Sequence, residues 1–182
     1  VDQKKGYADE ATINKIEIVM GQANVETSSR RCVKPALDKA ELTDAPAMAI
    51  ELNDGRIVTG KTTSLLGSAS AAILNALKHL GNIDDQIPLI SPSIIEPIQK
   101  LKVENLGNNN PRLHVDEILI ALAISATTNP LSHLAMTQLE KLKGCEAHSS
   151  VILSDVDMNV FRKLGINLTC EPKYHTKKLY HK

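Results

Sequence analysis

The sequence predicts an α/β domain with a mixed β-sheet and helices on both faces of the sheet. Two observations lead to this fold class. Residues 47–63 have the alternation of a β-hairpin, and a segment with helical periodicity follows at 68–81. Near the end of the chain, an extended run, a helix and a second extended run are joined by short loops, which is typical of a right-handed parallel crossover. A hairpin and a parallel crossover together make a mixed sheet.

The composition narrows the class of protein. Of the 182 residues, 42% are hydrophobic but only 2% are aromatic, so stacking platforms for single-stranded nucleic acid are not expected. The formal net charge is zero, which provides no basic field for nucleic acid or anionic lipid, and no apolar run is long enough to span a membrane. The three cysteines are widely separated, so we expect a cytoplasmic protein without a metal or another cofactor.

The first part of the chain is predicted to be helical. Apolar residues recur at helical spacing in 11–25, and a second short helix follows at 33–40. The sequence starts at Val1 rather than at a methionine. We therefore expect residues 1–43 to continue a preceding domain that is missing from this sequence, and residues 44–182 to form the C-terminal α/β domain.

The segment GRIVTGKT at 55–62 has the letters of a phosphate-binding loop, G-x-x-x-x-G-K-[ST]. Such a loop needs a strand before its first glycine and a helix directly after its last residues. Here an Asp-Gly turn signal precedes three consecutive β-branched residues, Ile57 to Thr59, which favour extended backbone. We therefore predict a hairpin strand at 56–59 and no nucleotide bound to this segment.

Two helices are predicted after the hairpin. The helix at 68–81 has Ser68 as its expected N-cap and Gly81 as its stop, and its small residues indicate close packing on the sheet. The helix at 91–107 begins with a Ser-Pro start signal, and Pro97 is expected to kink or split it.

The second half of the chain is predicted to hold two more helices and the crossover. Residues 114–144 are divided before Pro130, because a residue that precedes proline avoids the helical conformation. Residues 118–124 are apolar nearly all round, which predicts central burial. The crossover is predicted from three consecutive segments: a strand at 149–154, a helix capped by Asp155 and a strand at 166–172.

Four long segments carry a resemblance to a known family. They are DGRIVTGKTTSLLGSASAAILNALKHLG, LISPSIIEPIQKLKVENLG, NNPRLHVDEILIALAISATTNP and KLKGCEAHSSVILSDVDMNVFRKLGINLTCEP, in this order. The chain resembles the C-terminal region of a bacterial family of unknown function, domain of unknown function 1846, also called uncharacterised protein family 0371. The resemblance covers the chain from Asp44 onwards and, more loosely, the residues before it. It implies a larger preceding domain with a glycine-rich nucleotide-type loop, and it brings no established activity.

The order of elements is also similar to the cytidine deaminase-like fold, in which a hairpin leads into a small-residue helix and a strand–helix–strand unit follows. A zinc deaminase has His or Cys followed by Ala-Glu at the start of that helix, and Pro-Cys-x-x-Cys later. This chain has Ser68-Ala69-Ser70 at the first place and no paired cysteines at the second. The resemblance therefore implies a member of the fold without zinc, as among its transformylases, and zinc-dependent deamination is excluded.

The first candidate site is NPRLHVDE, a polar turn that leads into a hydrophobic helix. Arg112 is a candidate ligand-binding residue, because it and the N–H groups of a helix start can hold an anion. His114, Asp116 and Glu117 are candidate catalytic residues for proton transfer. The alternative is that the acidic residues only complement the helix dipole and that His114 or Asp116 caps the helix. Both interpretations stay open.

Other polar residues lie at the junctions of elements. His148, in the segment 144–150 between a helix and a strand, is a further catalytic candidate, although a surface or sheet-edge histidine also explains it. Lys61 and Thr62 leave the hairpin at a strand end, where α/β sheets place ligands, and Arg30 is a candidate for binding a phosphate or carboxylate. The alternative for these three is that they are ordinary loop or surface residues.

Two functions are compatible with these observations. In the first, the chain is the C-terminal domain of a nucleotide- or phosphometabolite-related enzyme and contributes substrate-binding residues to a site completed by the missing N-terminal domain. In the second, it is a non-catalytic scaffold or oligomerisation domain, as the apolar helix at 116–128 indicates. We expect a homo-oligomer, and neither nucleic acid nor a membrane is expected as a partner.

Overall fold

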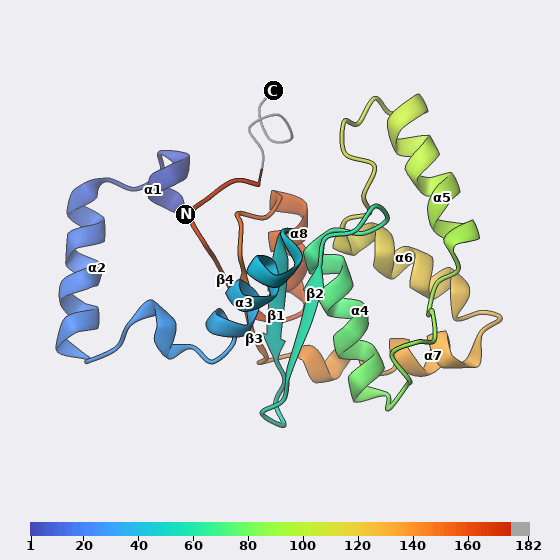
Figure 1. Cartoon of the computed structure of the whole chain (residues 1–182), viewed down its shortest axis with the longest axis horizontal. Coiled ribbons are helices and arrows are strands. Elements are labelled where there is room, and N and C mark those ends of the chain that lie inside the picture. Colours follow the sequence, from blue (N-terminus) through green and yellow to red (C-terminus); the bar gives the residue numbers. More distant parts are fainter. Residues whose placement is uncertain (176–182) are drawn as a thin grey trace.

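A four-stranded mixed β-sheet forms the centre of the fold (Figure 1). The computed structural model describes residues 1–175. The strands are β1 (Ala47–Glu51), β2 (Ile57–Lys61), β3 (Glu146–Ser149) and β4 (Asn167–Cys170), and their order in the sheet is β2-β1-β3-β4. β1 runs antiparallel to β2 and to β3, whereas β3 and β4 are parallel. The predicted mixed sheet, built from a hairpin and a parallel crossover, is confirmed.

Helices cover both faces of this sheet. On one face, Ala49 of β1 packs with Ala36, and on the other face the neighbouring Ile50 belongs to a large core with Ile73 and Phe161. Because successive side chains of a strand point to opposite faces, the helices that carry these partners lie on opposite sides. The α-helices are α1 (Asp2–Lys5), α2 (Glu10–Gln22), α3 (Val33–Thr43), α4 (Ser68–Leu80), α5 (Pro92–Lys100), α6 (Val115–Ser125), α7 (Pro130–Met136) and α8 (Asp155–Lys163).

The hairpin turns through a three-residue loop. The Leu52 N–H donates to the Arg56 carbonyl at 2.8 Å, and Gly55, the last residue of the loop, has a φ of 81°. A glycine in the left-handed region is typical of this hairpin loop. Residues 57–61 all pair with β1, so the backbone there is extended. The prediction that the GRIVTGKT letters do not form a phosphate-binding loop is confirmed.

α4 lies very close to β2, because the strand has no side chain at Gly60. A Cβ placed on Gly60 would lie 2.2 Å from the backbone nitrogen of Ala72 and 2.6 Å from its Cα. The small residues of α4 that predicted this close packing, Ala69 and Ala72 among them, are buried. The contact therefore joins helix backbone to strand backbone.

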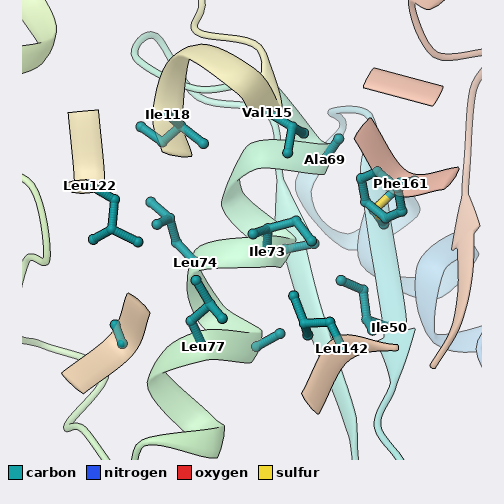
Figure 2. Close-up of a cluster of buried hydrophobic side chains, with 14 of the residues drawn as sticks. Ile50, Ala69, Ile73, Leu74, Leu77, Val115, Ile118, Leu122, Leu142 and Phe161 are labelled. Carbon is teal, nitrogen blue, oxygen red and sulfur yellow. The ribbon is translucent and has the colours of Figure 1, made fainter. Parts of the chain in front are cut away.

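The main core lies on the α4 side of the sheet. Figure 2 shows Ile73 and Leu77 of α4 among apolar side chains from several other elements. Phe161, the single phenylalanine of the chain, is fully buried in this core. The other labelled residues are Ile50, Ala69, Leu74, Val115, Ile118, Leu122 and Leu142.

Two helix starts differ by one residue from the prediction. The N-cap of α4 is Gly67 rather than Ser68, so Ser68 is the first helical residue and no side chain caps this helix. The N-cap of α8 is Ser154 rather than Asp155, because the extended backbone needed at a cap lies at Ser154, whose hydroxyl accepts the Asp157 N–H at 3.1 Å.

Pro97 is expected from the sequence to kink or split the helix at 91–107, and the split does not occur. α5 continues through Pro97 to Lys100 and then widens into a π-helical turn, Leu101–Asn105. Pro97 removes one backbone hydrogen bond, but Ile95 is buried and Ile98 packs on the core beside it, so the apolar face of the helix keeps its contacts. The division before Pro130 is confirmed: α6 ends at Ser125, and Asn129 caps α7.

Two predictions for the second half need correction. The strand expected at 149–154 is formed by Glu146–Ser149, and the apolar residues 151–153 are buried after the chain has left the sheet. The apolar run at 151–153 therefore indicates burial and not strand pairing. α6 is not buried on all sides: Ile120 is 61% exposed and Ile124 is 56% exposed, whereas Ile118 is fully buried. A helix that is apolar all round gives no signal of which side lacks a partner.

α2 lies apart from the sheet (Figure 1), whereas α1 is connected to α8 by Lys5 Nζ, which donates to Asp155 Oδ1 at 2.9 Å. α2 has no buried residue, and Ile16, Ile18 and Val19 are 51%, 60% and 62% exposed. Within residues 1–175, no helix combines the length and apolar character that crossing a membrane requires. The apolar face of α2 thus lies uncovered in this structure.

We expect Gly60→Ala to lower the free energy of unfolding by about 2–3 kcal/mol, because the new methyl group would meet helix backbone rather than a flexible side chain. Urea unfolding followed by circular dichroism measures this loss. Gly21→Ala is the matched control, since the added Cβ has no atom within 4 Å and lies in a helix, where alanine is favoured. An equal loss in both variants would contradict the close approach of α4 and β2.

Candidate functional site

A small cavity lies where the carboxyl ends of β2 and β3 meet the N-termini of α4, α6 and α8. β2 and β3 end on the same side of the sheet because both are antiparallel to β1. The cavity has a volume of about 50 Å³, and its lining includes Thr62 after β2, Leu153 after β3, Ser68, His114 and Asp157. Strand carboxyl ends are the usual ligand-binding edge of α/β sheets. We therefore take this cavity as the candidate site.

His114 and Asp157 form a hydrogen-bonded pair in the cavity. His114 Nδ1 lies 3.0 Å from Asp157 Oδ2, and Asp157 Oδ1 accepts the Val115 N–H at 2.9 Å. The Ser154 hydroxyl donates to Asp157 Oδ2 at 2.8 Å. Both carboxylate oxygens are thus occupied, and the imidazole is held by its Nδ1. His114 Nε2 makes no hydrogen bond within residues 1–175.

The pair shifts the pKa of each partner. The hydrogen bond to Asp157 raises the pKa of His114 above its ordinary value of 6.5, against the opposing effect of burial. Burial by itself would raise the pKa of Asp157, but the hydrogen bond and charge of His114, together with the hydrogen bonds from the Val115 N–H and the Ser154 hydroxyl, outweigh it, and the pKa of Asp157 is lowered. Asp157 is therefore an anion at neutral pH, and it makes the imidazole of His114 more basic, which suits a group that takes up a proton.

Glu117 and Asp116 are engaged at the start of α6. Glu117 Oε2 accepts Lys102 Nζ at 2.7 Å and the His114 N–H at 2.8 Å, and Asp116 Oδ1 accepts the Glu117 N–H at 2.8 Å. Lys102 comes from the π-helical turn, is buried, and also donates to the Arg112 carbonyl at 2.8 Å. These contacts match the capping alternative for the two acids, and neither acid lines the cavity.

Arg112 and Thr62 line the cavity, whereas Lys61 does not. Arg112 Nε donates to the Thr63 carbonyl at 2.7 Å, and its other guanidinium nitrogens have no hydrogen-bond partner in the part of the chain that the structure describes. Lys61 is the last residue of β2 and is exposed. Its side chain points to the α3 face of the sheet, because the preceding residue, Gly60, faces α4.

Arg30 and His148 lie together on the α3 face of the sheet. Arg30 donates to Glu146 and to the hydroxyl of Thr169. Because a guanidinium only donates, the hydroxyl hydrogen of Thr169 remains available to His148 Nδ1, which is 2.8 Å away. His148 Nε2 then donates to Glu171 Oε1 at 3.2 Å. This chain of hydrogen bonds joins β3, β4 and the segment before α3.

The two histidines therefore differ in chemistry. His148 is only 4% exposed, both of its nitrogens have partners, and burial lowers its pKa although Glu171 acts in the opposite direction. This environment favours a neutral, structural imidazole. Of the predicted site residues, Thr62, Arg112 and His114 share the cavity, whereas His148 and Arg30 form a separate cluster. No three His, Cys, Asp or Glu residues within 1–175 are arranged to hold a metal ion.

The sequence pattern does not single out Asp157, Ser154 or Lys102. Ser154 and Asp157 have the Ser-x-x-Asp spacing of a capping box, which signals a helix start but gives no link to His114, 43 residues earlier. Lysines are almost never fully buried, so Lys102 reads as a surface residue of the predicted helix. Lys102 lies in the π-helical turn, which has no clear sequence signal.

The chain is similar to bacterial proteins of unknown function. The family model described as "Domain of unknown function DUF1846, C-terminal" matches residues 28–180. Proteins named UPF0371 from Corynebacterium glutamicum and Streptococcus uberis are each 50% identical to the chain over all 182 residues, and one from Streptococcus pneumoniae is 48% identical. The chain spans 37% of the length of these relatives. The resemblance inferred from the sequence motifs is confirmed.

The pair of His114 and Asp157 should make stability depend on pH. Because the pKa of His114 is raised, the pair's contribution to the free energy of unfolding is complete below pH 6.5. This contribution is lost as the pH rises through the pKa of His114 in the folded protein. Because the pKa of Asp157 is lowered, its contribution is present above pH 3.8 and is lost only in stronger acid. Asp157→Asn should therefore lower the free energy of unfolding by roughly 1–3 kcal/mol at about pH 6, and by less at about pH 8.

Urea unfolding at the two pH values measures this difference. Asp155→Asn is the control on the same helix, since its carboxylate is 81% exposed and, within residues 1–175, pairs only with Lys5. It should change stability little at either pH. A loss for Asp157→Asn that is the same at both values would show that the charge of His114 does not depend on Asp157.

Proposed function

This chain belongs to the DUF1846 family, also named UPF0371, and we propose that it is the C-terminal domain of a longer enzyme that acts on a nucleotide or another phosphorylated metabolite. The domain supplies substrate-binding groups and a general base. The remainder of the site comes from the part of the protein outside this chain. One support is that the chain spans 37% of the length of its relatives. The other is that the cavity has a volume of about 50 Å³, whereas a pocket for a whole small-molecule ligand usually has a volume of about 300–1,000 Å³.

The observation that carries the proposal is the His114–Asp157 pair. Asp157 holds the imidazole by Nδ1, which leaves Nε2 as the nitrogen that takes up or releases a proton. The hydrogen bond to Asp157 raises the pKa of His114 from its ordinary value of 6.5, which makes Nε2 a stronger proton acceptor. Asp157 acts as a positioning residue, as its oxygens are occupied by donors from α6 and α8. His114 is the catalytic residue in this proposal.

The surroundings of the pair favour an anionic substrate. Arg112 lines the cavity with guanidinium N–H groups that have no partner in residues 1–175. The N-termini of α4, α6 and α8 meet at the same place, and the positive end of each helix dipole attracts negative charge. Phosphate is the group that arginine and helix N-termini recognise together most often.

We further propose that the domain has the cytidine deaminase-like fold without zinc. The hairpin β1–β2, the small-residue helix α4 and the β3–α8–β4 crossover support this relation. The starts of α4 and α8, where the deaminase zinc ligands would stand, lie at the same cavity and carry Ser68 and Asp157 instead. A cytoplasmic location is supported by the three cysteines, which are all free thiols.

The full-length protein allows a direct test. A thermal-shift panel of nucleotides and phosphorylated metabolites should identify a ligand, and Arg112→Ala should weaken its binding by roughly 10- to 100-fold, because a charged hydrogen bond is lost. His114→Gln should keep binding within a few-fold and lower turnover by roughly 10²- to 10⁴-fold. The basic form of His114 is required, so turnover should rise with pH, and Asp157→Asn should move that rise to lower pH.

His133→Gln is the control, because His133 is an exposed histidine of α7 outside the cavity. It should behave as wild type. Ligand binding and turnover that are unchanged in both Arg112→Ala and His114→Gln would remove this cavity from the active site.

A second function, self-association without chemistry of its own, is favoured by the uncovered side of α6. Ile120 and Ile124 are separated by one helical turn, face the same way and are both more than half exposed. Two copies of the chain in contact along this side would remove them from water. A homo-oligomer is compatible with the enzyme proposal as well.

Sedimentation velocity tests this second function. The wild-type chain should form a dimer or a larger species, and Ile124→Lys should shift it to monomer, because a charge in the interface stays unpaired. Leu42→Lys, at an 81% exposed position on α3, should leave the association unchanged. A wild-type chain that is monomeric over the whole concentration range would exclude self-association through α6.

A further inference from the structure

We propose that the N-terminus of α4 binds one phosphate group and that Ser68 is a direct ligand of this group. This inference rests on the proposed function, because it concerns the same cavity. It names the part of the substrate that this chain holds. It requires binding alone and no proton transfer. It can therefore be tested on the chain itself.

The first support is the set of free donors at the start of α4. This helix has 13 residues, and its N-cap, Gly67, has no side chain to accept from the first turn. The first N–H groups of a helix have no acceptor inside the helix. In residues 1–175, no carbonyl or side chain accepts from the amides of Ser68 and Ala69. Gly67, Ser68 and Ala69 all line the cavity.

The second, independent support is the hydroxyl of Ser68. This side chain is 4% exposed, lines the cavity and makes no hydrogen bond to any residue in the described part of the chain. Ser70, two residues later and 1% exposed, shows the usual state of a buried serine, as its hydroxyl donates to the Leu113 carbonyl at 2.8 Å. The oxygen of Ser68 keeps some access to solvent, so it can hydrogen-bond to a group that enters the cavity.

Charge and size select the ligand class. Arg112 and His114 line the same cavity and supply positive charge, and the negative charge of Asp157 is already balanced by its own donors. A volume of about 50 Å³ holds a few water-sized atoms, which suits a phosphate group and not a complete nucleotide. Donors on α4 and on the turn before α6 suit an anion whose oxygens point in several directions.

Titration of the ¹⁵N-labelled chain with inorganic phosphate tests the inference. The amide signals of Ser68 and Ala69 should shift and saturate, whereas the first-turn amides of α5, which Ser91 caps and which lie outside the cavity, should stay in place. Sodium chloride at equal ionic strength should produce no saturating shift. Acetate distinguishes a planar carboxylate from phosphate, and it should bind more weakly than phosphate.

Ser68→Ala should weaken phosphate binding about tenfold, because a hydrogen bond to a charged oxygen is lost. Alanine is the best helix former, so this variant should keep the fold. Ser93→Ala, in the first turn of α5, is the matched control and should bind phosphate as wild type does. Unaltered phosphate affinity in Ser68→Ala, or amides of Ser68 and Ala69 that do not shift up to tens of millimolar phosphate, would overturn the inference.

The two proposals fail separately. If phosphate does not bind to α4 but His114→Gln still abolishes turnover of the full-length protein, the phosphate site is wrong and the general base stands. If phosphate binds through Ser68 but His114→Gln leaves turnover unchanged, the anion site stands and the proposed role of His114 falls.

Discussion

The position of α4 on the hairpin governs the arrangement of the rest of the domain. Because Gly60 has no side chain, the backbone of α4 lies directly against β2. The start of the helix is thereby brought to the end of the strand, where the Ser70 hydroxyl donates to the Leu113 carbonyl at 2.8 Å and Leu66 forms a bridge with Leu113. These contacts fix the turn that leads into α6. The place of His114 beside the cavity therefore follows from the close contact at Gly60.

His114 and His148 show how hydrogen-bond partners decide the chemistry of a histidine. His114 has a carboxylate at Nδ1 and an open Nε2, and its pKa is raised by that carboxylate. His148 has Thr169 at Nδ1 and a partner at Nε2 as well, and burial lowers its pKa. The first arrangement leaves one ring nitrogen open to accept a proton. The second uses both nitrogens to tie the strands together, and it does so on the face of the sheet away from the cavity.

Local features of the fold were predictable from the sequence, and contacts between distant segments were not. The hairpin is fixed by neighbouring residues, so its turn and its extended strand were read correctly. The cavity could be anticipated only in outline, because ends of elements gather at the carboxyl edge of a sheet. The contact of His114 with Asp157 depends on where α8 crosses α6, which no local pattern encodes. His148 lies elsewhere because alternate strand residues face opposite sides of the sheet, and Arg30, before α3, lies on the same side as His148.

The π-helical turn at Leu101–Asn105 ends the helical segment that begins with α5. Lys102 lies in this turn, is only 3% exposed and donates both to Glu117 Oε2 and to the Arg112 carbonyl. A lysine is tolerated at such depth only where its charge is paired. Replacing Lys102 by methionine would keep the apolar stem and leave Glu117 with the His114 N–H, so the segment after α5 would lose its polar connection to the start of α6.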